Sequence, residues 1–118
     1  MGSALSAQCV EALLARKGQC ALMANILMRT SRMLEVARSG DWTLVAAMER
    51  KRSQLVKQCF ADPVSDVNSQ IFSEALAIML HVNEELVALL HEAKTEAASR
   101  YSVDRKKHQA VAHYLDIG

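Results

Sequence analysis

The sequence predicts an all-α domain, an antiparallel helical bundle with three main helices and a short C-terminal helix. Hydrophobic residues make up 51% of the 118 residues but aromatic residues only 4%, so we expect a core of Leu, Met, Ala and Val. Four glycines and one proline leave few helix breakers, which implies short connections. Apolar residues also recur at helical spacing along most of the chain. We therefore predict a single domain over residues 1–118.

The first helix is predicted over residues 6–39. Its apolar stripe repeats every seven residues, at Leu13, Cys20, Leu27 and Leu34. Gly18 lies inside this pattern, where a glycine costs roughly 1 kcal/mol relative to alanine. Gly18 is therefore the place at which a bend or break of this helix would occur.

A sharp corner is predicted at Gly40 and Asp41. Glycine has no Cβ and can adopt the left-handed conformation that ends a helix, and Asp41 can accept hydrogen bonds from the first N–H groups of the next helix. So short a connection makes the two helices an antiparallel hairpin. The second helix is predicted over residues 42–60, with Trp42 closing the end of the core. Arg52 lies beside its buried stripe, where we expect it to pair with an acid of the third helix or to expose its head.

The third helix is predicted over residues 66–100 and a fourth over residues 103–116. The pattern of the third helix breaks at residues 99–102, and Ser102 can cap the fourth. The first turn of that fourth helix is basic, which is unfavourable at the positive end of a helix dipole. We therefore expect the fourth helix to be weak in isolation.

Helix lengths predict two uncovered apolar segments. At 1.5 Å per residue, the first and third helices are about 50 Å long and the second about 28 Å. The start of the first helix then projects with Val10, Leu13 and Leu14, and the end of the third projects at the other end of the bundle. We hypothesise that a second copy covers the first segment, giving a homodimer, and that the fourth helix folds back over the other.

Charge and cysteine usage restrict the classes of function. The net charge of +1 gives no drive toward nucleic acid or membrane. Basic residues concentrate in residues 16–57 and acidic residues in residues 64–93, which is complementary if these segments become neighbouring helices. Three cysteines without C-x-x-C spacing fit a reducing compartment. With no apparent signal peptide or membrane span, we expect a cytoplasmic protein.

The sequence offers no motif for catalysis, and we expect neither an enzyme nor a metal or other cofactor. It contains no Gly-rich phosphate loop, no Ser–His–acid arrangement and no Cys/His metal spacing. His91 and Lys94 have the H-x-x-K spacing of histidine phosphotransfer domains, which are four-helix bundles of similar length. Thr95 stands where a glycine usually follows in that family. A phosphotransfer or signalling bundle is therefore the alternative function, together with a general protein-interaction adaptor.

The stretch A-R-S-G-D-W-T-L-V, followed by M-E-R-K-R-S-Q-L-V, resembles the centre of the FliT-like flagellar export chaperones. The length, the Gly-acidic-Trp corner and a last helix with the run from Ala110 to Tyr114 are also similar, over about residues 13–115. The resemblance implies a cytoplasmic chaperone of flagellar type III secretion that holds the C-terminal segment of the filament-cap protein. Some members of this family also bind the export ATPase complex or a flagellar transcription regulator.

The resemblance further implies a cargo groove and a detachable cover. Carried over to this sequence, the groove consists of Val82, Leu86, Leu89, Leu90 and Ala93. The cover consists of Val111, Tyr114 and Leu115 in the last helix. Three buried side chains contribute roughly 5–8 kcal/mol, and ordering about fourteen residues costs at least as much. These magnitudes favour a detachable cover, with a fixed fourth helix of a closed bundle as the alternative.

Overall fold

A computed structural model describes residues 2–117, and the side chains of residues 7–112. The elements in chain order are α1 (Gly2–Arg16), α2 (Gly18–Arg38), α3 (Trp42–Cys59), the short 3-10 helix η1 (Asp66–Asn68) and α4 (Ser69–Ile117). Residues 2–117 contain no strand, so the all-α prediction is confirmed.

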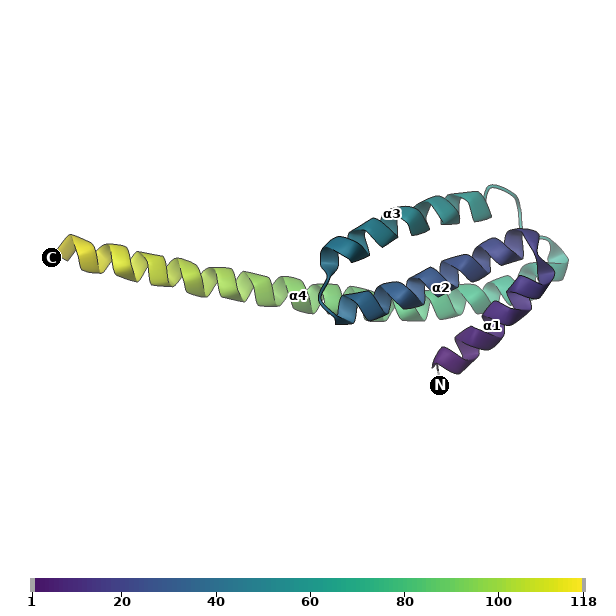
Figure 1. Ribbon diagram of the computed structural model, residues 1–118, viewed down its shortest axis with the longest axis horizontal. Helices are drawn as coiled ribbons and strands as arrows, with labels where there is room; N and C mark the ends of the chain where they lie inside the picture. The colour runs from purple at the N-terminus through teal and green to yellow at the C-terminus, as the bar shows by residue number, and fades with distance from the viewer. Residues whose placement is uncertain (1, 118) are drawn as a thin grey trace.

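Helix α2 is the centre of the fold. Helices α1, α3 and α4 each pack against it, and α1 also contacts α4. Successive helices run in opposite directions, so that α2 and α4 are parallel to each other (Figure 1). The bundle therefore has the up-down order of an antiparallel helical bundle, with α4 extending far beyond the other helices.

The corner between α2 and α3 has the predicted chemistry. Gly40 adopts a left-handed conformation with φ 85°, and its N–H donates to the carbonyl of Ala37 at 3.0 Å. The Asp41 carboxylate accepts from the backbone N–H of Leu44 at 3.2 Å. Trp42 is half-buried against the core at this end of the bundle. Local capping chemistry alone was sufficient to locate this corner.

Two apolar clusters form the core. The first cluster lies where α1 meets α2, the end of α3 and the start of α4, and its most buried members include Leu13, Met23, Ile26, Leu27, Cys59 and Phe72. The second cluster lies toward the α2–α3 corner and consists of Met33, Leu34, Ala37, Val45 and Leu86. Partly buried residues, among them Val82 and Leu89, pack against the second cluster.

A polar layer separates the two clusters. Arg52 of α3 donates to the hydroxyl of Thr30 on α2 at 3.2 Å and to the amide oxygen of Asn83 on α4 at 3.2 Å. The Thr30 hydroxyl donates in turn to the Ile26 carbonyl at 2.7 Å. Neither arrangement expected for Arg52 is found: its acidic partner is Glu49 on its own helix, and only 12% of its side-chain surface is exposed. The complementary charges of α2 and α4 instead meet in the ion pair of Arg38 with Glu85 at 3.2 Å.

Residues 6–39 form parts of two helices rather than one, and the break falls at the predicted position beside Gly18. The chain turns at Lys17 (φ 60°, ψ −172°) and Gly18 (φ 55°), and α1 folds back along α2. This turn buries Leu13 completely, which a straight helix would leave uncovered. Arg16, at the end of α1, connects this turn to η1 by donating to the Val67 carbonyl at 3.2 Å and to Asn68 Oδ1 at 2.9 Å. The predicted overhang at the start of the first helix is therefore absent.

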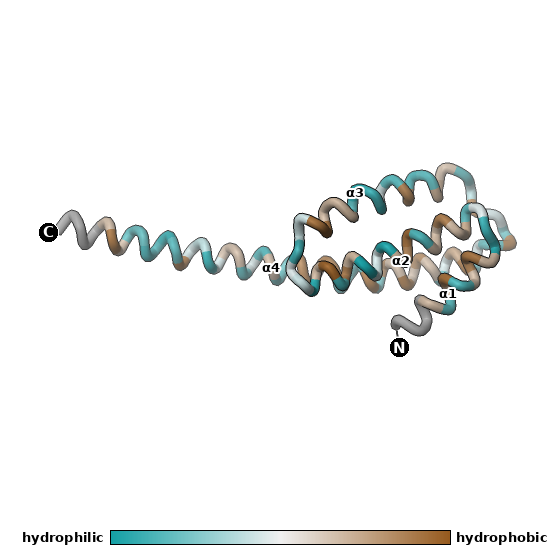
Figure 2. Tube along the Cα trace, viewed as in Figure 1, coloured by the Kyte–Doolittle hydropathy of each residue, from teal (hydrophilic) through white to brown (hydrophobic). Residues whose placement is uncertain are grey.

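The predicted helices over residues 66–100 and 103–116 are one helix, α4, of 49 residues. No glycine or proline occurs within it, and the serines at 99 and 102 cost too little to end a helix. The helix gives the molecule extents of 78 × 30 × 18 Å. Figure 2 shows mostly hydrophilic residues on its projecting part. Of the helices described over residues 2–117, none combines the length and apolar character that crossing a membrane requires.

Candidate functional site

The residues predicted to form the cargo groove lie on α4 beside the second core cluster. Leu86 is buried, with only 7% of its surface exposed, and Val82 and Leu89 are partly buried against the same cluster. Leu90 is 36% exposed and Ala93 is half-buried. The structure therefore brings the five residues together on one helix, but only the end of this row, at Leu90 and Ala93, borders open surface.

A second apolar row on α4, facing solvent, was missed in the sequence. Leu80 and Val87 lie two turns apart on one face of the helix and are 58% and 55% exposed. Leu90, one turn further, continues this row toward the projecting part of α4. The seven-residue spacing of Leu80 and Val87 indicates that they share a face of the helix. The sequence pattern does not reveal which apolar face of a long helix packs against the other helices and which faces solvent.

The predicted cover lies far from the groove in this conformation. Val111 is 58% exposed, and Tyr114 and Leu115 lie outside the residues whose side chains the structure describes. Along a continuous helix, the 21 residues from Leu90 to Val111 span about 32 Å. The structure thus does not bring the cover and the groove together.

The residues predicted for a dimer interface have different environments. Leu13 is fully buried within the chain, whereas Leu14 is 46% exposed and Val10 is half-buried. Leu13 has no apolar surface left for a second copy. The homodimer itself stays a prediction, with Leu14 and Val10 as the accessible members of the set.

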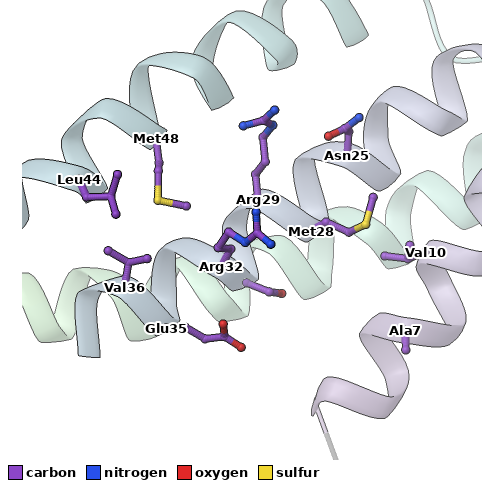
Figure 3. Close-up of a pocket in the computed structure, with 11 residues that line it drawn as sticks. Ala7, Val10, Asn25, Met28, Arg29, Arg32, Glu35, Val36, Leu44 and Met48 are labelled. Carbon is purple, nitrogen blue, oxygen red and sulfur yellow. The ribbon is translucent and has the colours of Figure 1, made fainter. Parts of the chain in front are cut away.

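Sequence reasoning also missed a groove on the face of α2 that points away from α4. The groove has a volume of about 910 Å³ and lies between α1 and α3. Figure 3 shows Arg29 and Arg32 of α2 lying between Leu44 and Met48 of α3 on one side and Ala7 and Val10 of α1 on the other. Asn25, Met28, Ser31, Glu35 and Val36 complete its lining. The signal was a second, weaker stripe on α2 that mixes apolar and basic residues.

This groove has an unsatisfied positive charge. The Nε atom of Arg29 is buried and has no hydrogen-bond partner. Among the described side chains, neither Arg29 nor Arg32 forms an ion pair, whereas Arg38 and Arg52 each pair with a glutamate. Arg29 is half-buried and Arg32 is exposed, so both guanidinium groups remain available to a carboxylate or a carbonyl of a partner.

The three cysteines are buried, and none of them forms a disulfide. Burial raises the pKa of the Cys9 thiol, and the carboxylate of Glu74 raises it further. Burial likewise raises the pKa of the Cys59 thiol, with a smaller contribution from Cys20. A raised pKa disfavours the thiolate, which is the nucleophilic form.

The surface of α4 carries the residues of the phosphotransfer-like spacing. His91 and Lys94 are both exposed, and the Thr95 hydroxyl donates to the His91 carbonyl at 2.9 Å. Within the described side chains, no three His, Cys, Asp or Glu residues converge on a position that would hold a metal ion.

Comparison with known proteins assigns the family. The family model described as "Flagellar protein FliT" matches residues 20–116, which include nearly all of α2 and α4 and the whole of α3. No curated protein and no solved structure matches the chain. The match covers most of the sequence, including the Gly-Asp-Trp corner. The chain therefore belongs to the FliT flagellar protein family.

Proposed function

We propose that this protein is a cytoplasmic flagellar export chaperone that binds the C-terminal segment of the filament-cap protein. The observation that carries the proposal is the family match over residues 20–116. Membership of the FliT family implies an export chaperone role, and the chaperones of this family are not enzymes. The long, exposed helix α4 suits such a role because it presents apolar side chains to an incoming segment.

The proposed cargo surface is the row of Val82, Leu86, Leu89, Leu90 and Ala93. Its open end at Leu90 and Ala93 lies where α4 leaves the bundle, and the exposed Val87 lies beside it. An amphipathic cargo helix that packs along α4 would extend the second core cluster past the α2–α3 corner, as a helix laid into a groove. Leu90 is the member of the row that such a helix would bury first.

The cover role of Val111, Tyr114 and Leu115 belongs to the same proposal and requires a second conformation. In that conformation α4 bends near residues 99–102, and the last turns fold back toward Leu90. None of the side chains of residues 94–112 is buried, so no packing against the bundle opposes this movement. The cover would compete with cargo for the same apolar row.

Calorimetry tests both parts of the proposal. The C-terminal segment of the filament-cap protein from the same genome is titrated into the full chain and into residues 1–100. We expect both forms to bind, and the truncated form to bind more tightly because its cover is absent. No binding by either form, with both shown to be helical by circular dichroism, would exclude the cap-chaperone function. Equal affinities would exclude the cover alone.

A matched pair of variants locates the surface. Leu90→Asp places a charge at the open end of the row and should weaken cargo binding at least tenfold, about 1.4 kcal/mol. Val67→Asp is the control, because Val67 is 84% exposed and lies on η1 at the opposite end of the bundle. If both variants bind cargo like the unaltered chain, the cargo surface lies elsewhere.

A homodimer and further partners extend this proposal. The predicted dimer would use Val10 and Leu14 of α1, and light scattering after gel filtration would detect it at micromolar concentration. Leu14→Glu should shift a dimer toward the monomer. The export ATPase complex and the flagellar transcription regulator are additional partners that the family resemblance suggests.

A further inference from the structure

We propose that the groove between α1 and α3 is a second protein-binding site, which takes an amphipathic helix bearing a carboxylate on its apolar face. The groove lies on the side of α2 away from α4, so an occupant there would not compete with a cargo on α4. The inference does not depend on the identity of the cargo.

The walls of the groove are apolar and open to solvent. Met28 and Leu44 are each 45% exposed, although both lie within the bundle rather than on a projecting segment. Met48 lies beside Leu44 (Figure 3), and methionine side chains adapt their shape to a partner. The lining of α2 runs from Asn25 to Val36, about 17 Å along the helix. That length matches three turns of a docked helix.

The floor of the groove selects for negative charge. Nε of Arg29 is a buried donor without a partner, and Arg32, one turn along, has no ion pair among the described side chains. The planar guanidinium forms paired hydrogen bonds with a carboxylate, and these are among the strongest that a side chain makes. Glu35 lies near one end of the groove only. A partner carboxylate in the groove would pair with the terminal guanidinium nitrogens of Arg29 or Arg32, which form no ion pair among the described side chains.

Charge also argues against the chain's own helix as the occupant. The projecting part of α4 carries Arg105, Lys106 and Lys107 in succession. Folding this segment into the groove, or inserting that of a second copy, would bring three further cations to a groove that already holds Arg29 and Arg32. A separate protein with an acidic amphipathic helix fits the groove better than either.

Designed peptides test the proposal on the full chain. The probe is a labelled 18-residue helical peptide with a stripe of leucines and one central glutamate in that stripe. The matched peptide has glutamine in place of the glutamate. Fluorescence anisotropy should give at least about tenfold tighter binding of the glutamate peptide, the effect of a hydrogen bond to a charged group. This comparison needs only the unaltered protein and therefore does not depend on the folding of a variant.

Variants then assign the preference to the groove. The double substitution Arg29→Gln and Arg32→Gln should abolish the preference for glutamate. Arg50→Gln should retain it, because Arg50 is an exposed arginine of α3 outside the groove lining. Equal binding of the two peptides, or a preference that survives the double substitution, would overturn the proposal. A preference that Leu90→Asp abolishes would also overturn it, since this result would place the peptide on α4.

Discussion

Arg52 connects three helices through a single side chain. It donates to Thr30 of α2 and Asn83 of α4 while it extends from α3, and only 12% of its side-chain surface is exposed. Its neighbours Arg50 and Lys51 are exposed. Residues 49–52 are all charged, but the helical period turns only Arg52 toward the core and leaves the other three exposed. A polar layer of this kind fixes the relative register of packed helices, since sliding would leave its donors unpaired.

Arg52→Ala should lower the free energy of unfolding by about 2 kcal/mol. The substitution removes two interhelical hydrogen bonds from a charged donor, each of which contributes on the order of 1 kcal/mol or more. Arg50→Ala is the matched control and should change stability by less than about 0.5 kcal/mol, as exposed substitutions do. Urea unfolding followed by circular dichroism measures both values. Equal, small effects of the two substitutions would show that the polar layer contributes nothing to stability.

The buried thiols should make the protein less stable in alkali. Both Cys9 and Cys59 have a pKa above the ordinary value of 9.0 in the folded chain, chiefly because of burial. Above about pH 9 the unfolded chain loses these protons first, so the free energy of unfolding falls as pH rises toward the folded pKa values. Below pH 9 this contribution to stability is fully present.

Urea midpoints at pH 7 and pH 10 measure this dependence. Because lysine and tyrosine also titrate near pH 10, the comparison requires a variant in which Cys9 and Cys59 are replaced by alanine. The loss of stability on raising the pH should be smaller in this variant than in the unaltered chain. An equal loss in both proteins would assign the alkaline effect to other groups.

At the scale of elements, the turn between α1 and α2 depends on a strained residue. Lys17 has φ 60° and ψ −172°, a region of backbone conformation that almost only glycine adopts without cost. Lys17→Gly should therefore raise the free energy of unfolding by about 1 kcal/mol. In contrast, Lys51→Gly inside α3 should lower it by about 1 kcal/mol, the usual cost of glycine within a helix.

The same pair of substitutions distinguishes a turn from a continuous helix. If residues 6–39 formed one straight helix in solution, Lys17 would be an interior helical residue. Lys17→Gly would then destabilise the protein as much as Lys51→Gly does. Thermal and urea unfolding of the two variants, compared under identical conditions, gives the sign of each effect.

Elements whose boundaries depend on local chemistry were predictable from the sequence. The α2–α3 corner follows from Gly40 and Asp41, since a left-handed C-cap and a carboxylate N-cap each need only one residue. The turn at Gly18 was less certain, because a glycine within a helical pattern is compatible with a bend, a break or neither. The burial of Leu13 against the other helices, which no local pattern encodes, favours the break.

The full length of α4 was not predictable from local chemistry, because the described part of its second half has no tertiary contacts that shape the sequence pattern. Residues 99–102 interrupt the apolar pattern, but an exposed helix needs no such pattern to continue. The groove around Arg29 was missed for a related reason. Its lining combines three helices, and the position of α1 across the groove from Leu44 and Met48 could not be inferred while residues 6–39 were expected to form one helix.

At the scale of the whole molecule, α4 determines the shape. The Cα radius of gyration is 21.0 Å, against about 14 Å for a compact domain of this length. The excess comes from the projecting helix, whose described side chains beyond Ala93 are all exposed. A helix without tertiary contacts is stabilised only by its own hydrogen bonds and local pairs, such as Arg100 with Glu96. Because residues 94–112 are all exposed, no tertiary packing of these side chains would be lost if the projecting helix moved.

Small-angle X-ray scattering distinguishes these conformations in solution. The extended helix predicts a radius of gyration near 21.0 Å for the full chain, and a clear decrease for residues 1–100, which lack most of the projection. A cover that is folded back in the free protein predicts instead nearly equal radii for the two forms. Because no described side chain between residues 101 and 112 is buried, the truncated form should keep the unfolding midpoint of the full chain. A large loss of stability on truncation would contradict the extended structure and would identify the last turns of α4 as part of a closed bundle.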